Sequence, residues 1–178
     1  MNAKRGGSVG GLGFDNARRW REERSPENVW ITPQWILSRV RDVFGGPINF
    51  DPCTTPGNPC DAERFVCEPD DGILAEWSGD VYCNPPFSAA TVKHWVDKCL
   101  MAQARGARVL LLLPMRMETV PLQIALREAD AALFFSGRVD FEGMTRHTAV
   151  PCVLFAFGVD LDCMSDLGVI VKRKEVAA

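Results

Sequence analysis

The stretch Asp-Val-Tyr-Cys-Asn-Pro-Pro-Phe-Ser at residues 80–88 constrains the fold more than any other part of the chain. Its first half is apolar and suits a strand, which the two prolines stop because they have no N–H group to donate to a sheet. Ser88 can then cap a helix, since apolar residues recur at helical spacing over 92–100. The pattern predicts a strand, a rigid polar loop and a helix, and ligands bind at such loops in open α/β sheets.

The loop itself, Asn84-Pro85-Pro86-Phe87, has the groups needed to hold a planar base that carries an exocyclic amine. The side-chain oxygen of Asn84 can accept one amino hydrogen and the carbonyl of Pro85 the other, while Phe87 offers a flat face for stacking. A base inside a duplex cannot reach such a pocket, so it has to flip out. The alternative is a structural turn, and four residues alone do not decide between the two.

The rest of the chain alternates between strand and helix patterns, which predicts an α/β fold with a largely parallel sheet. Thr32 is a suitable N-cap, and Pro33 suits the first position of a helix. Right-handed crossovers would bring the loops after Phe50, Cys83 and Leu113 to one edge of the sheet. The helices are expected over 33–44, 91–100 and 120–129, and the strands over 47–53, 64–67, 80–83, 107–114, 131–135 and 151–157.

Length and composition indicate a single domain whose thiols are reduced. A chain of 178 residues is long enough for a substantial core, and its longest apolar run is too short to span a membrane. The N-terminus does not resemble a signal peptide, and the seven cysteines are an odd number, several of them in apolar strands. Both features favour the cytoplasm.

Metal binding and histidine chemistry are not expected. Cys53, Cys60 and Cys67 recur every seven residues, whereas zinc sites usually contain pairs of cysteines two to four residues apart. His94 and His147 lie in no Ser/His/Asp or His/Glu arrangement, so we interpret both as ordinary surface or core residues.

The net charge of −3 provides no general attraction to nucleic acid, so any DNA binding has to depend on local basic clusters. A glycine-rich and then basic N-terminal arm is expected over 1–27, and a C-terminal extension with a basic tail over 161–178. The candidate cations are Arg18, Arg19, Arg21, Arg24, Arg116, Arg138, Arg146, Lys172, Arg173 and Lys174.

Three motifs stand in a fixed order: Trp30-x-Thr32-Pro33, Phe50-Asp51-Pro52-Cys53 and Asn84-Pro85-Pro86-Phe87. This order resembles the small phage-type DNA adenine N-6 methyltransferases, the Dam-like family of phages and prophages, over about residues 28 to 158. The resemblance implies a Rossmann-like, S-adenosylmethionine-dependent methyltransferase domain over 28–160, abbreviated in its N-terminal half.

The resemblance also implies roles for individual residues. Residues 84–87 would form the target-amine pocket, and Asp51, Pro52 and Cys53 the turn that binds S-adenosylmethionine. The segment with Trp30, Thr32 and Pro33 would pack beside the methionine end of the cofactor. An acid after the second strand usually holds the ribose: Glu68 is the nearest, with Asp70 and Asp71 as alternatives.

Two departures from the family pattern stand out. Phe87 replaces the commoner tyrosine but keeps the stacking face. The turn after Phe50 lacks the usual glycine-rich loop, and the roughly thirty residues between Asp51 and Asn84 are too few for two full helix–strand crossovers.

The resemblance implies methylation of the N-6 amine of adenine in double-stranded DNA, with the target base flipped out. Arg116 and Arg138 would contact phosphates at the mouth of the pocket, although Arg138 could instead pair with Asp140 or Glu142 to fix a turn. Other possible substrates are an adenine in RNA and a glutamine amide in a protein. An inactive nucleic-acid-binding module of the same fold is a further alternative.

Overall fold

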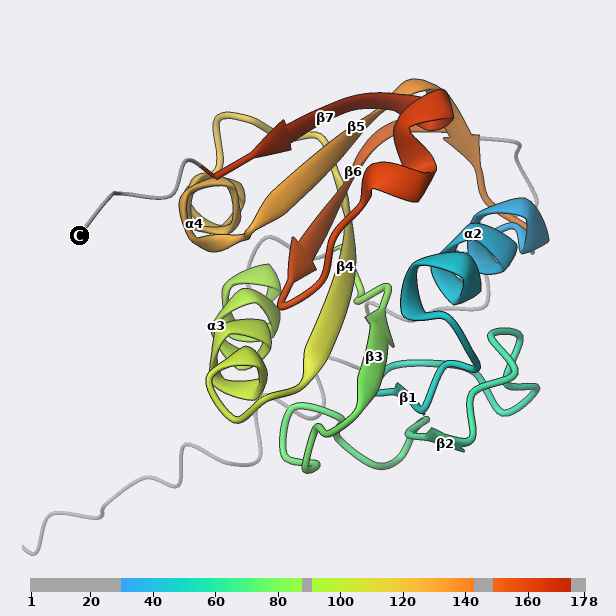
Figure 1. The fold of residues 1–178 in the computed structure, drawn as a ribbon. Helices are drawn as coiled ribbons and strands as arrows, with labels where there is room; N and C mark the ends of the chain where they lie inside the picture. Colours follow the sequence, from blue (N-terminus) through green and yellow to red (C-terminus); the bar gives the residue numbers. More distant parts are fainter. Residues whose placement is uncertain (1–29, 88–90, 143–148, 174–178) are drawn as a thin grey trace, which may run out of the picture.

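The computed structural model of the chain describes residues 30–87, 91–142 and 149–173 (Figure 1). Seven strands form one sheet, and helices lie on both of its faces. The helical elements are α2 (Gln34–Phe44), α3 (Val92–Gln103), α4 (Val120–Glu128) and the 3-10 helix η2 (Asp162–Leu167). The strands are β1 (Phe50–Asp51), β2 (Arg64–Phe65), β3 (Asp80–Cys83), β4 (Arg108–Pro114), β5 (Ala131–Asp140), β6 (Ala149–Phe157) and β7 (Gly168–Lys172).

The strand order in the sheet is β2-β1-β3-β4-β6-β5-β7. Strands β2, β1, β3 and β4 run parallel, so the loops after β1, β3 and β4 share one edge, as expected. The expectation of a largely parallel sheet is wrong for the other half, where β4–β6, β5–β6 and β5–β7 pair antiparallel. A strand buried on both faces is apolar in either direction, so the β6 sequence could not reveal its orientation.

Two apolar cores lie on opposite faces of the sheet. Helix α2 and the segment of η2 cover one face, and α3 and α4 cover the other (Figure 1). Strand β4 serves both cores: Leu110 and Leu112 belong to the first, and Val109, Leu111 and Leu113 to the second. This alternation follows from the two-residue period of a strand.

The N-terminal half of the sheet is abbreviated, as the short spacing between Asp51 and Asn84 predicted. Strands β1 and β2 have two residues each, and residues 52–79 contain turns and no helix. Strand β2 is exposed on both residues, whereas both residues of β1 are buried. The edge of the sheet at which β1, β3 and β4 end therefore forms without helical crossovers between β1, β2 and β3.

Several element boundaries differ from the prediction. Strand β5 continues to Asp140, through a register shift between Phe134 and Arg138, whereas the sequence predicted a strand over 131–135 and then a turn with a short extension over 137–141. The predicted C-terminal extension contains η2 and the edge strand β7, which pairs with β5. Ser88, Arg146, His147 and the basic arm before residue 28 lie outside the described residues. Within the described part of the chain, no helix is long and apolar enough to cross a membrane.

Candidate active site

Asn84 follows the last residue of β3, and its amide is held by two acceptors from one neighbouring segment. Its Nδ2 donates to the carbonyl oxygen of Trp30 at 2.7 Å and to the hydroxyl of Thr32 at 3.1 Å. A carbonyl oxygen can only accept, so the nitrogen of the amide has to face Trp30. This contact decides which end of the amide is the nitrogen and leaves Oδ1 at the other end.

The Oδ1 atom of Asn84 is buried and accepts no hydrogen bond from residues 30–87, 91–142 and 149–173. An unsatisfied buried acceptor costs about 1–3 kcal/mol, and native proteins contain few of them. Such an atom at the end of a central strand is a candidate for binding a donor from a ligand. Because the atom is covered, a ligand reaches it only after the groups above it move aside.

Thr32 does not act as the N-cap that the sequence predicted. Helix α2 begins at Gln34 with Pro33 in the cap position, and no side chain caps it. The hydroxyl of Thr32, 2 % exposed, instead lies 2.8 Å from that of Tyr82 and accepts from Asn84. Burial raises the pKa of Tyr82 well above its ordinary value, so its phenol is neutral.

The segment that carries Trp30 and Thr32 is fixed by the end of β5. Ile31 forms an antiparallel bridge with Glu142, in which its N–H donates at 3.1 Å and its carbonyl accepts at 2.9 Å. The residues on either side of Ile31 are thereby held above the end of β3. The site consequently depends on three segments that are far apart in the sequence.

Three aromatic rings pack together beside Asn84. The centroid of Trp30 lies 5.0 Å from that of Phe87 and 5.1 Å from that of Phe141, and both pairs are edge-to-face. Phe87 and Phe141 are 5.9 Å apart in the same arrangement. These contacts fix the loop after β3 through its aromatic residue.

The turn after β1 meets the end of β3. The carboxylate of Asp51 is 3 % exposed and accepts from the backbone N–H of Cys53 at 3.0 Å. Burial, followed by the charge of Asp51 and its hydrogen bond to the Cys60 thiol, raises the pKa of Cys60. The Sγ atom of Cys53 lies 3.6 Å from that of Cys83, the residue before Asn84. The two predicted ligand loops are therefore in direct contact.

The acidic segment after β2 lies against the same turn. A Cβ atom on Gly72 would stand 1.6 Å from the carbonyl oxygen of Pro52, so the two backbones touch. Glu68 and Asp71 are exposed, and the Asp71 carboxylate accepts from the N–H of Ile73 at 2.9 Å. Asp71 precedes Gly72 and so lies beside this turn, whereas Glu68 follows β2, which pairs with β1 on the side away from β4.

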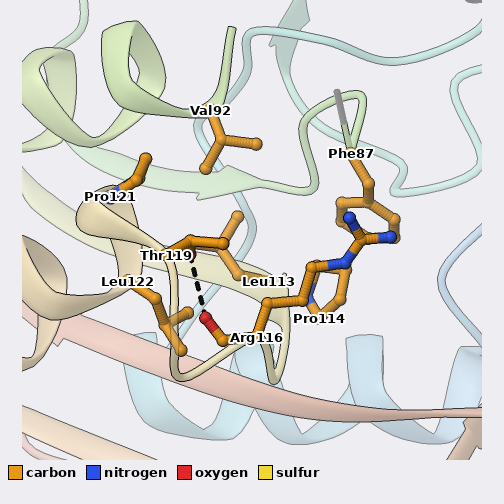
Figure 2. A pocket seen from close by; sticks show the side chains of 8 residues that line it. All are labelled: Phe87, Val92, Leu113, Pro114, Arg116, Thr119, Pro121 and Leu122. Atoms are coloured by element: carbon orange, nitrogen blue, oxygen red, sulfur yellow. Dashed lines mark hydrogen bonds between the residues drawn. The ribbon is translucent and has the colours of Figure 1, made fainter. Parts of the chain in front are cut away.

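A cavity opens at the carboxyl end of β4, between the beginnings of α3 and α4 (Figure 2). It is a small cavity of about 50 Å³ and is partly open to solvent. Its lining is apolar apart from Arg116 and Thr119: Phe87, Val92, Leu113, Pro114, Pro121 and Leu122. Phe87 therefore lines this cavity on one side and packs against the aromatic residues of the Asn84 site on the other.

The two arginines predicted to contact DNA lie at the same edge of the sheet. The side chain of Arg116 is exposed and extends toward Phe87 (Figure 2). The carbonyl of Arg116 accepts from the Thr119 hydroxyl at 2.9 Å. Arg138 pairs in register with Pro151, whose carbonyl accepts from the N–H of Met115 at 2.8 Å. Arg138 and Asp140 both have interaction partners, so a structural role for Arg138 stays open.

Sequence reasoning missed two residues of the site, Tyr82 and Phe141. Tyr82 is the only tyrosine of the chain and stands between the apolar residues Val81 and Cys83 of β3. Because a buried phenol needs a partner, this position could have signalled a polar contact. Phe141 gave no comparable signal, since its packing depends on how β5 and the segment at Trp30 meet.

Comparison with known proteins agrees with the family suggested by the ordered motifs. The model of the family described as "DNA N-6-adenine-methyltransferase (Dam)" matches residues 21–153, and the chain belongs to this family. One similar protein is the DNA N-6-adenine-methyltransferase of Haemophilus phage HP1 (strain HP1c1), 28% identical over 68 residues. That match covers 37% of this chain and 38% of the relative, so it spans well under half of either protein.

Proposed function

We propose that the protein transfers a methyl group from S-adenosylmethionine to the N-6 amine of a flipped adenine in DNA, on a Rossmann-like sheet. Family membership supports the reaction class. The observation that carries the proposal is the buried, unsatisfied Oδ1 of Asn84, because an exocyclic amine is the donor that such an acceptor lacks. The strand order, with ligand loops at the ends of parallel β1, β3 and β4, supports the Rossmann-like assignment.

The chemistry assigned to Asn84 concerns the lone pair of the amine. In adenine this pair is delocalised into the ring, which makes the nitrogen a poor nucleophile. A hydrogen bond from N-6 to Oδ1 of Asn84, and a second one to the carbonyl of Pro85, favour a tetrahedral nitrogen with a localised pair. These bonds strengthen as positive charge develops on nitrogen, so they stabilise the transition state more than the ground state.

The residues around the turn after β1 fit a cationic cofactor. S-adenosylmethionine supplies a methyl group activated by its sulfonium when it is bound. The buried Asp51 carboxylate suits the positively charged methionine portion, because a buried charge needs a charged or polar partner. Trp30, Pro33, Pro52 and Cys53 would line this portion, and Glu68 or Asp71 would accept from the ribose hydroxyls.

The proposal includes base flipping because of where the oxygen of the Asn84 side chain lies. Oδ1 of Asn84 is enclosed, so an adenine stacked in a duplex could not reach it. Phe87 offers a face on which an extrahelical base could stack, and the exposed Arg116 beside it supports a contact with a nearby phosphate. A flat base would stack on aromatic and apolar side chains there.

Expression in a host without DNA methylation tests the proposal directly. Sequencing of modified bases should reveal N-6-methyladenine at one recurring sequence, and an Asn84→Ala variant should abolish it. Labelled methyl transfer to matched DNA and RNA oligonucleotides then separates the two nucleic acids. Methylation of RNA alone, or cofactor binding without transfer to any substrate, would contradict the proposal.

A further inference from the structure

We propose that Tyr82 and Thr32 are positioning residues that orient the Asn84 amide so that its Oδ1 faces the substrate amine. The proposal rests on the methyl-transfer function proposed above and adds two residues that do not touch the substrate. From the sequence, Thr32 was expected to lie beside the cofactor or to cap a helix. The proposal instead gives its hydroxyl the role of orienting the Asn84 amide.

The first step of the argument concerns the two hydrogens of the Asn84 amide. One points to the Trp30 carbonyl at 2.7 Å and the other to the Thr32 hydroxyl at 3.1 Å. The last torsion of an asparagine side chain is broad, so a single anchor leaves the amide plane free to rotate. Two anchors on one nitrogen fix both the plane and the direction of Oδ1.

The second step concerns what fixes the Thr32 hydroxyl itself. It lies 2.8 Å from the hydroxyl of Tyr82, a fully buried residue on β3. Tyr82 and Asn84 are two residues apart on one extended segment, so their side chains project on the same side. Thr32 bridges them from the neighbouring segment. Strand β3, buried between β1 and β4, therefore serves as the rigid reference for its own catalytic loop.

The third step concerns the strength of the acceptor. Hydrogen bonds in a chain polarise one another in a water-poor environment. An amide whose nitrogen donates to two acceptors carries more negative charge on its oxygen. Burial keeps the phenol of Tyr82 neutral, so the chain of hydroxyls does not change its charge over the ordinary range of assay pH.

Kinetics of conservative variants test the proposal. Tyr82→Phe and Thr32→Val each remove one hydroxyl, and we expect kcat to fall about 3- to 10-fold for a neutral hydrogen bond. The Kd for S-adenosylmethionine and the KM for DNA should stay within about twofold, because the proposal assigns both hydroxyls to contacts inside the protein. Thr32→Ser should retain most activity, and Ser165→Ala, which removes an exposed hydroxyl in η2, should have no effect.

A double-variant cycle separates positioning from independent effects. Tyr82 acts through Thr32, so the double variant should be about as slow as Thr32→Val alone. Fully multiplicative losses would contradict the proposal, as would unchanged kcat in both single variants. A loss of cofactor affinity in Thr32→Val without a change in kcat would contradict the proposal and assign Thr32 to cofactor binding.

Nuclear magnetic resonance of the side-chain amide gives a readout that does not need catalysis. The two Nδ2 protons of Asn84, assigned by their loss in Asn84→Asp, should shift in Tyr82→Phe and shift further in Thr32→Val, which removes the acceptor of one of them. Unchanged resonances in both variants would overturn the positioning role even if the wild-type protein is active. Shifted resonances in a wild-type protein that methylates no substrate would instead refute the proposed function alone.

Discussion

The thiols of Cys53 and Cys83 lie 3.6 Å apart, and this contact joins the turn after β1 to the strand that leads into Asn84. The pKa of Cys83 lies well above its ordinary value. Burial is the main cause, and the hydrogen bond with Cys53 is the second. Cys53 is half-buried and stands on the turn assigned to the cofactor. A displacement of the turn after β1 would therefore be transmitted to Cys83, the residue before Asn84.

This arrangement predicts a selective thiol titration. Burial raises the pKa of Cys60, Cys83, Cys99 and Cys152, the last to about 12, so these thiols stay protonated and unreactive at pH 8. An aromatic disulfide reagent should modify Cys163 fastest, then the half-buried Cys53 and Cys67, and all seven cysteines only after denaturation. Mass spectrometry of the modified peptides gives the order.

A bound cofactor analogue adds a control to this titration. Sinefungin, an unreactive analogue of S-adenosylmethionine, should slow the modification of Cys53 and leave that of Cys163 unchanged. Equal protection of both thiols, or of neither, would remove the turn after β1 from the cofactor site.

The Asn84→Ala variant should lose most methyl transfer, because it removes the acceptor for the substrate amine. We expect a barrier higher by about 2–4 kcal/mol, comparable to the loss of one preorganised catalytic hydrogen bond. Cofactor affinity, measured by calorimetry, should stay within a few-fold of the wild type. Near-normal turnover would instead assign Asn84 to a structural turn.

Asp51→Asn should weaken S-adenosylmethionine binding more than DNA binding. Asparagine keeps the size of the side chain and an oxygen that can accept from the Cys53 N–H, but it removes the negative charge. Calorimetry with the cofactor and a gel-shift assay with DNA measure the two affinities. An unchanged cofactor affinity combined with weaker DNA binding would contradict the assignment.

Gly72→Ala should displace the turn after β1, although Gly72 lies about twenty residues further along the chain. The new Cβ would stand 1.6 Å from the carbonyl oxygen of Pro52, so one of the two backbones has to move. Cofactor affinity should therefore fall, with a lower Tm. Gly57→Ala is the matched control, since a Cβ there meets nothing within 4 Å. Equal effects of the two substitutions would show that the contact at Pro52 does not position the turn.

The sequence predicted the central elements because their patterns are local. Strand β3 and its proline loop, the apolar run of β4 and helix α4 were found within a few residues of their observed limits. Each has a composition that suits one kind of element in almost any context. The shared edge of the loops after β1, β3 and β4 also followed, because parallel strands align their carboxyl ends.

The rest depended on contacts between distant segments. Thr32 is a residue type that favours the N-cap position, but its hydroxyl forms hydrogen bonds with Asn84 and Tyr82, about fifty residues away. Strand β7 contains the β-branched run Val169-Ile170-Val171, a strand signal that the expectation of a basic tail passed over, and its pairing with β5 places it at the edge of the sheet. The antiparallel β6 is as apolar as a parallel strand would be. Tertiary partners overrode the local preference of Thr32 and decided the direction of β6, which its sequence leaves undetermined.

The last prediction concerns how an acidic protein holds DNA. Arg116 is exposed at the rim of the cavity beside Phe87, and its backbone is fixed by the bond from Thr119. If it contacts a phosphate, Arg116→Ala should reduce the salt slope of DNA binding by roughly one, about equally for all sequences. Arg105→Ala is the control, because Arg105 is exposed at the opposite end of β4.

Arg138→Ala separates the two roles open to the second arginine. A reduced salt slope with an unchanged Tm would assign it to the phosphate backbone beside Arg116. An unchanged slope with a lowered Tm would assign it to the end of β5, where Arg138 and Asp140 both have interaction partners. If Arg116→Ala and Arg105→Ala reduce the salt slope of DNA binding equally, Arg116 does not contact a phosphate that Arg105 lacks. The DNA would then have to bind at another edge of the sheet.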